Sequence, residues 1–243
     1  MIAALYVERG GCYWDLPGVD PWDERRDARH YAEPHRVVAH PPCQRWGRFW
    51  HGSTRKPHQY ELGDDAGCFA AALTVVRRWG GVLEHPAYSH AWGAFGLSWP
   101  IRGGWSEADL VGGWTCHVEQ AHYGHIARKA TWLYAVGCDL PDLRWGPAPQ
   151  RLNPIAVERY GYAYARRAGV ISYLGGKDKS KLRAATPVQF RDLLINLVND
   201  PSSAGTPHGA NDLNMQCPIH APTGNSERGP CRKEMTAETI TGF

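Results

Sequence analysis

The sequence predicts an α/β fold in which a mostly parallel sheet carries helices on both faces. Short apolar runs rich in β-branched residues occur at 2–7 and 36–40, a composition typical of strands buried on both sides. An amphipathic pattern follows the second run, and a third apolar run lies at 81–86, so residues 36–86 predict a βαβ unit. With 243 residues, of which 43% are hydrophobic and 21% charged, the chain is long enough for one such domain.

The helix of this unit is predicted between Gly63 and Gly80. Asp64 and Asp65 stand at its start, where acidic side chains interact favourably with the helix dipole. Apolar residues then recur with a helical period, two arginines occupy the last turn, and Gly80 ends the segment.

The second half of the chain predicts two further strands and a helix. Residues 115–124 and 127–137 are strand-like runs separated by a glycine-containing turn, which indicates an antiparallel pair at the edge of the sheet. Thr186 as N-cap and Pro187 at the first helical position predict a helix through residues 188–198.

The last segment, 200–243, is dense in Gly, Pro, Ser, Thr and Asn and predicts a disordered tail behind a domain of residues 1–199. It contains Cys217, His220 and Cys231, but a second pair of ligands is missing, so we expect no metal site. The tail has five acidic and three basic residues. Because the whole chain carries +3, residues 1–199 carry about +5, a mild indication of an anionic partner.

Several classes of protein are excluded by the composition. No apolar run is long enough to cross a membrane, and the first residues lack the pattern of a secretory signal. The seven cysteines are an odd number without regular spacing, which favours reduced thiols over a disulfide framework. We therefore expect a cytoplasmic monomer.

The candidate chemistry lies where two predicted parallel strands end. The first is followed by His-Pro-Pro-Cys-Gln at 40–44, and the second ends in Glu-His-Pro at 84–86. Ligands of open α/β sheets bind beyond the carboxyl ends of the strands. A thiol on a rigid double-proline loop near a carboxylate predicts a nucleophile at Cys43 with Glu84 beside it. The alternative is that Cys43 is a small buried apolar residue and Glu84 a solvated strand end.

In this order the segments resemble the DNA cytosine-C5 methyltransferases. That family has a Pro-Cys-Gln loop and a strand ending in Glu-Asn, and two later blocks extend the similarity: EQAHYGHIARKATWLYAVG and RAATPVQFRDLL. The four blocks cover about residues 36–197. The resemblance implies a Rossmann-like methyltransferase fold with an antiparallel edge hairpin.

It also implies a mechanism on double-stranded DNA with a flipped cytosine. Cys43 would add to C6, Glu84 would hold and protonate N3, and a methyl group would pass from S-adenosylmethionine to C5. Arg128 or Lys129 would stand for a basic pair of the family, and the register leaves both open. The resemblance further assigns two sets of binding residues: Gly10, Gly11, Asp20 and Pro41 to the cofactor, and Gln44, Arg45, His85 and Thr186 to the substrate.

The N-terminal region departs from the family. Only seven residues, 12–18, separate the glycine pair from Val19-Asp20, where the family has a helix. A different reaction at pyrimidine C5, using the same Cys43 and Glu84, therefore stays open, as does a DNA-binding homologue without cofactor. A third alternative is an amino-methyltransferase acting on cytosine N4 or adenine N6, whose Pro-Pro loop has an aromatic residue at the position of Cys43.

Two segments could contact DNA outside the site. The interval 138–182 interleaves tyrosines with arginines and lysines, which suits phosphate contact and base stacking and predicts a small target-recognition insert, although a solvated loop has the same composition. In the segment after Cys43, either Trp46 or Trp50 could stack on a flipped base, or one could anchor a surface loop. The small size resembles phage-encoded members, for which we expect modification of phage DNA or evasion of restriction in the host cytoplasm.

Overall fold

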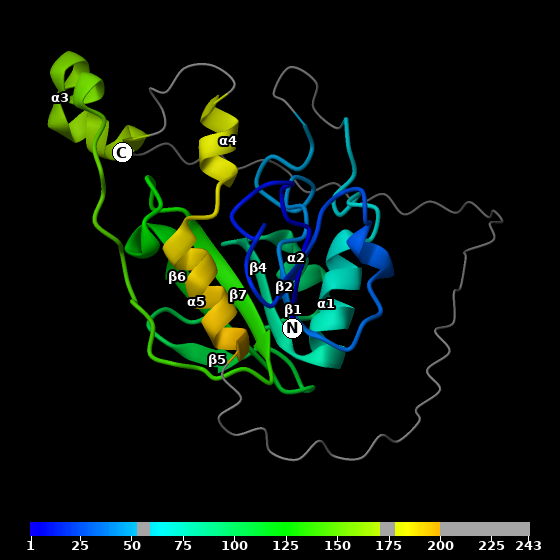
Figure 1. Cartoon of the computed structure of the whole chain (residues 1–243). Helices are drawn as coiled ribbons and strands as arrows, with labels where there is room; N and C mark the ends of the chain where they lie inside the picture. The colour runs from blue at the N-terminus through cyan, green and yellow to red at the C-terminus, as the bar shows by residue number, and fades with distance from the viewer. Residues whose placement is uncertain (53–58, 171–177, 200–243) are drawn as a thin grey trace, which may run out of the picture. The chain divides into compact units, whose positions relative to one another are not determined.

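The computed structural model describes residues 1–52, 59–170 and 178–199 (Figure 1). The chain divides into two units, Met1–Gly205 and Thr206–Phe243, and all of the described residues belong to the first. The tail expected at 200–243, with Cys217, His220 and Cys231, lies outside the described residues.

One sheet of seven strands organises the first unit, in the order β2-β1-β3-β4-β7-β6-β5. The strands are β1 Ile2–Leu5, β2 Val19–Trp22, β3 Arg36–Ala39, β4 Gly81–Pro86, β5 Trp105–Glu107, β6 Gly113–Glu119 and β7 Ala130–Val136. The first four in chain order are parallel, and each later neighbour pair is antiparallel. The α/β class and the βαβ unit are thus confirmed.

The position expected for the antiparallel pair is wrong in one respect. β6 and β7 do pair, but β7 also pairs with β4 and therefore lies inside the sheet. The edge is β5, a strand of three residues that is too short to show an alternating pattern in the sequence.

Helices connect and cover the strands. They are the 3-10 helices η1 Ala28–His30 and η2 Gln120–Tyr123, and the α-helices α1 Cys68–Trp79, α2 His90–Ala94, α3 Pro154–Ala168, α4 Asp178–Ala184 and α5 Val188–Asn199. Within the described residues, none of them is long and apolar enough to span a bilayer.

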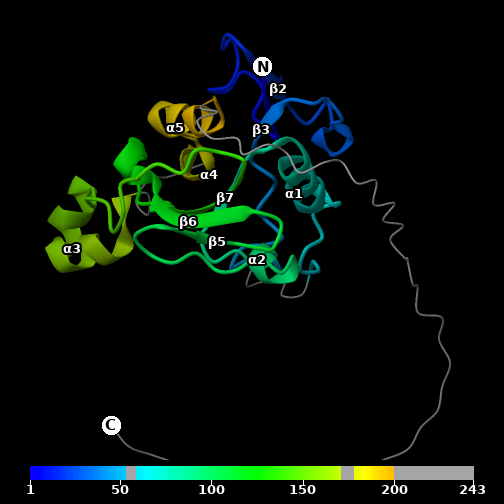
Figure 2. The same ribbon diagram turned by 90° about the horizontal axis from the view of Figure 1, so that it is seen from below.

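Alternating strand residues build two cores, one on each face of the sheet. Ala3 and Leu5 of β1 point into a cluster that contains Phe69 of α1, whereas Ile2 and Ala4 point into a second cluster that contains residues of α5. Figure 2 shows α1 and α5 separated by the strands. The expected helices on both faces are confirmed.

The start of α1 is set by Asp65 and not by Gly63. The Asp65 carboxylate accepts hydrogen bonds from the backbone N–H of Gly67 (2.9 Å) and Phe69 (2.8 Å) and from the indole of Trp46 (2.7 Å). Phe69 is the second residue of α1, so Asp65 satisfies one N–H group of its first turn, and the helix begins at Cys68, later than expected.

A close approach of two backbones fixes the register of the site. Gly81 has φ +139°, and a Cβ atom there would lie 2.0 Å from the carbonyl oxygen of Val37. Only glycine at position 81 therefore allows β3 and β4 to pair in the observed register, in which Ala39 lies opposite Leu83. Continued by one residue, the same register brings His40 opposite Glu84.

Candidate active site at the carboxyl ends of β3 and β4

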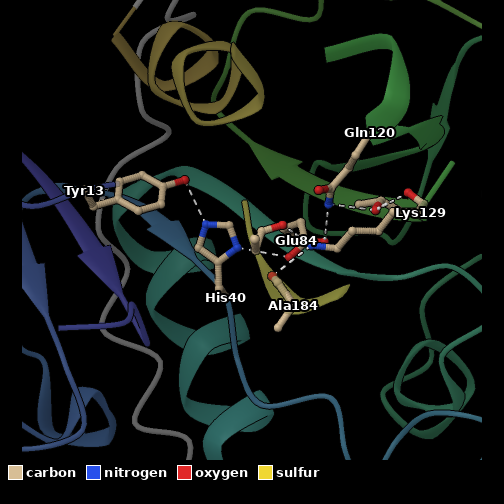
Figure 3. Close-up of polar contacts among 8 residues, drawn as sticks. Tyr13, His40, Glu84, Gln120, Lys129 and Ala184 are labelled. Carbon is tan, nitrogen blue, oxygen red and sulfur yellow. Dashed lines mark hydrogen bonds and ion pairs between the residues drawn. The ribbon is translucent and has the colours of Figure 1, made fainter. Parts of the chain in front are cut away.

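Three polar side chains form a hydrogen-bonded chain where β3 and β4 end (Figure 3). His40 Nδ1 lies 3.0 Å from Glu84 Oε2, and the Tyr13 hydroxyl lies 2.8 Å from His40 Nε2. A carboxylate can only accept, so we assign a proton to Nδ1, which donates to Glu84, and the Tyr13 hydroxyl lies against the other ring nitrogen. Tyr13 is only 3% exposed, so the chain is closed to solvent at that end.

Gln120 holds Glu84 from the other side. Its Nε2 donates to Glu84 Oε1 and to Thr131 Oγ1, both at 3.0 Å, and the Thr131 hydroxyl donates to the backbone carbonyl of Lys129. Gln120 is fully buried, and its Oε1 has no hydrogen-bond partner among the described residues. The amide is therefore oriented by the two groups to which it donates.

These contacts decide the charge of Glu84, which is 8% exposed. Burial acts to raise its pKa, but the hydrogen bond and charge of His40, together with Lys129, lower it to about 2. Glu84 is consequently a carboxylate at neutral pH, with a donor at each oxygen.

Lys129, and not Arg128, belongs to this site. Its backbone φ of +44° is rare for a residue other than glycine. Its ammonium group donates to the carbonyls of Ala184 (3.0 Å) and Ala185 (2.9 Å). Burial lowers the pKa of Lys129, an effect that the charges of Glu84 and Cys43 oppose. Arg128 points elsewhere: its Nε donates to the carbonyl of Ala148, outside the site.

Cys43 is half-buried in a turn after the double proline. Its carbonyl accepts from the backbone N–H of Trp46 (3.0 Å) and Gly47 (3.1 Å). Burial and the charge of Glu84 raise the pKa of the thiol, and the charge of Lys129 opposes them. The thiol is thus protonated at neutral pH, and its ionisation depends on the two charged neighbours.

Most of the residues that the resemblance assigned to the substrate lie outside this group. His85 is on the other face of the sheet, fully buried against Phe69 and Trp92, with Nδ1 2.7 Å from the Ser89 hydroxyl. Burial lowers its pKa to about 4, so it is neutral.

The loop after Cys43 has mainly structural contacts. The guanidinium carbon of Arg45 lies 3.3 Å from the centre of the Tyr60 ring, and Gln44 is exposed. The fourth residue assigned to the substrate, Thr186, is far along the chain from this loop and is half-buried just before α5. The expected stacking of Trp46 on a base is wrong: its ring is 6% exposed, packs on Phe69, and is held by Asp65. Trp46 is therefore the anchor of this loop, and Trp50 is half-buried.

The N-terminal region does not provide the expected cofactor site. The connection between β1 and β2, residues 6–18, contains no helix, and Gly10 (φ +65°) and Gly11 occupy tight turns within it. In open α/β sheets, ligands bind where the chain connections that follow two adjacent strands run to opposite sides. In the strand order β2-β1-β3-β4 that place lies beyond the ends of β1 and β3. At that end of the sheet the buried ring of Tyr13 lies against His40, the residue that follows β3, and is hydrogen-bonded to it.

Asp20 is not the acid at the end of β2. It lies inside the strand, where its carboxylate binds the guanidinium of Arg26 and accepts from the indole of Trp22 (2.8 Å). The residue at the strand end is Asp23, 8% exposed and accepting from the N–H of Arg25 and Arg26. Pro41, also assigned to the cofactor, is buried.

The interval 138–182 contains α3 and α4, and residues 171–177 of it lie outside the described residues. Tyr160, Tyr162 and Tyr164 of α3 are exposed, and Gly161 interrupts the helix with φ +78°. Beside the end of α3 is a pocket of about 240 Å³. Its lining includes Arg128, Lys129, Gln150 and Arg151.

Four members of the site escaped the sequence interpretation: Tyr13, His40, Gln120 and Thr131. His40 and Gln120 stand inside segments that suggested the site, and each is a polar residue at the end of an apolar strand. That is the signal by which they could have been found. Tyr13 gave no such signal, because it reaches His40 from a loop without regular structure.

No group of three or more metal-binding side chains occurs in the described part of the chain. Comparisons with known proteins found no match: no family model, no curated protein and no solved structure is similar to the chain.

Proposed function

We propose that this protein modifies C5 of a pyrimidine base in double-stranded DNA through a covalent adduct on Cys43. The observation that carries the proposal is geometric: at the carboxyl ends of β3 and β4, His40 and Gln120 hold the Glu84 carboxylate by hydrogen bonds, and the Cys43 thiol follows His40 by three residues. The charges of Glu84 and Lys129 act on the ionisation of that thiol. A Rossmann-like methyltransferase fold is part of this proposal, and the four parallel strands support it.

The site suits nucleophilic addition to the ring. The Cys43 thiol first gives its proton to water, and its sulfur then forms a bond to C6. The π electrons of the C5=C6 bond move toward the ring position next to N3, so that C5 becomes nucleophilic. In this proposal Glu84 would contact the N3 edge, and Lys129 would supply a positive charge for the developing anion. The base must leave the helical stack to be attacked.

The residues present do not fit S-adenosylmethionine as the resemblance would place it. Tyr13 is buried against His40 at the end of β3, the connection from β1 to β2 contains no helix to direct its N-terminus at a ligand, and the Asp20 carboxylate is already engaged by Arg26 and Trp22. We therefore derive no step through this cofactor, and the group that reacts with C5 is not assigned.

A DNA partner is supported by the surface next to the site. Exposed tyrosines of α3 and the arginine-lined pocket beside it combine stacking surface with positive charge. The charge of about +5 on residues 1–199 has the sign that a nucleic acid requires.

The test is release of tritium from C5, which needs no second substrate. After sulfur adds to C6, C5 takes a proton from water, the triton on C5 is then lost to water, and the thiolate leaves as the C5=C6 bond forms again. Mixed-sequence duplex DNA with tritium at C5 of its pyrimidines is incubated with the protein, and tritiated water is measured. We expect Cys43→Ala to lower release at least 100-fold. Cys68→Ala, at the half-buried first residue of α1, should leave release unchanged. Release that survives Cys43→Ala, or no release with or without S-adenosylmethionine, would refute the proposal.

A second candidate is a DNA-binding protein that performs no transfer reaction. It is favoured by one observation, the burial of Tyr13 against His40 at the end of β3, where a cofactor of this fold would be expected. DNA binding in a gel-shift assay without any tritium release would select it.

A further inference from the structure

We propose that the site selects a pyrimidine with a hydrogen-bond donor at N3, a uracil-type base, over cytosine. The inference rests on the proposed function, since it names the base that Cys43 attacks. It follows from the hydrogen bonds around Glu84, which differ from what a cytosine ring requires.

Both oxygens of Glu84 already accept from a donor. Oε1 accepts from Gln120 Nε2 and Oε2 from His40 Nδ1, each at 3.0 Å. The Gln120 amide cannot reverse to accept a proton from Glu84, because its Nε2 is also held by Thr131, whose own hydroxyl proton goes to the carbonyl of Lys129. The geometry thus presents Glu84 as an acceptor only.

The charges that face Glu84 keep it in that state. His40 and Lys129 both favour its ionised form, and burial, which opposes them, leaves its pKa at about 2. His85 stands on the opposite face of the sheet, and its low pKa keeps it neutral. At neutral pH, Glu84 has no proton to donate to a ring nitrogen.

The two pyrimidines differ at the atom that Glu84 would contact. Uracil carries N3–H, which donates to a carboxylate, whereas N3 of cytosine carries a lone pair that needs a donor. Cytosine at this site would set a lone pair against an anion, or would require Glu84 to be protonated first. Leaving such a polar pair unmatched is costly in a buried site.

The addition step also proceeds without a proton at N3 when the base is uracil. The bond from sulfur to C6 forms, the C5=C6 π pair moves to form C4=C5, and the carbonyl π pair moves onto O4. O4 becomes the anion, and Lys129 is the cation of the site. N3 keeps its proton throughout, donated to Glu84.

The experiment compares two mixed-sequence duplex pools that differ in the tritiated base. One carries cytosine with tritium at C5, and the other carries uracil with tritium at C5 in place of thymine. We expect tritium release from uracil at least about tenfold faster than from cytosine at pH 7.5. Equal release, or faster release from cytosine, would overturn the inference and leave the proposed function standing. Release from neither pool would refute both.

Glu84→Gln supplies the matched variant. A neutral amide can donate to N3 of cytosine and accept from its amino group, so the preference for uracil should fall at least tenfold in this variant. Its fold is checked by circular dichroism, and Glu107→Gln, at an exposed position in β5, should keep the wild-type preference. An unchanged ratio in folded Glu84→Gln would show that Glu84 does not read N3.

Discussion

Replacing Glu84 by Gln should change how the stability of the protein depends on pH. The pKa of Glu84 is about 2 in the folded protein, against an ordinary value of 4.5. At about 1.4 kcal/mol per pKa unit, its ionisation contributes about 3 kcal/mol to folding at neutral pH. Because the folded pKa is depressed, this contribution is complete above pH 4.5 and is lost as the pH falls from there toward 2.

The measurement is the free energy of unfolding in urea at pH 7 and pH 4. Linkage predicts that the wild-type protein loses about 1 kcal/mol more than Glu84→Gln over this interval. The variant should be less stable at pH 7, where its amide directs an N–H group toward His40 or Gln120, and the gap should narrow at pH 4. Titration of the other carboxylates is common to both proteins and cancels in the difference.

Glu107→Gln is the control, because Glu107 is exposed and its replacement should leave the pH dependence unchanged. If the gap between wild type and Glu84→Gln is the same at both pH values, the carboxylate is not held in its ionised form by its neighbours. The reasoning about the base would then lose its support as well.

Two further predictions concern the thiol and the sheet. Lys129→Met should raise the pKa of Cys43 and slow its alkylation by iodoacetamide at pH 8, because a positive charge that favours the thiolate is removed, whereas Arg128→Met should do neither. Alkylation is followed by peptide mass spectrometry, and equal rates in both variants would contradict the placement of Lys129. Gly81→Ala should lower the free energy of unfolding by at least about 3 kcal/mol, because the added Cβ would meet the β3 backbone. Gly93→Ala in α2 is the control, since a Cβ there has open space and the free energy of unfolding should not fall. Similar thermal melts for the two variants would refute the steric argument.

The parts of the fold that the sequence predicts are those with a strong local pattern. Two local patterns are visible in the sequence: the apolar runs of β1, β3 and β4, and the amphipathic period of α1. Each pattern involves only residues close together in the chain, so the sequence alone predicts these elements. β5 could not, because three residues carry no period. The start of α1 was misplaced because Gly63 and Asp65 are both plausible helix boundaries, and only the bond to Trp46 favours one.

The site was predicted in part for the same reason. Cys43 and Glu84 follow from strand ends, which are local features. The choice between Arg128 and Lys129 depends on one backbone angle, φ +44° at Lys129, which turns the two side chains in different directions. The contact between Tyr13 and His40 depends on the path of an irregular loop, and no pattern in the sequence specifies that path.

The two hydrogen bonds of Lys129 to the carbonyls of Ala184 and Ala185 tie the site to the joint between α4 and α5. An ammonium group has three protons, and two of them form the hydrogen bonds to these carbonyls. An anion formed on a bound base would compete with the carbonyls for the same charge. Any anion bound beside Lys129 would therefore weaken the hydrogen bonds that hold the segment between α4 and α5.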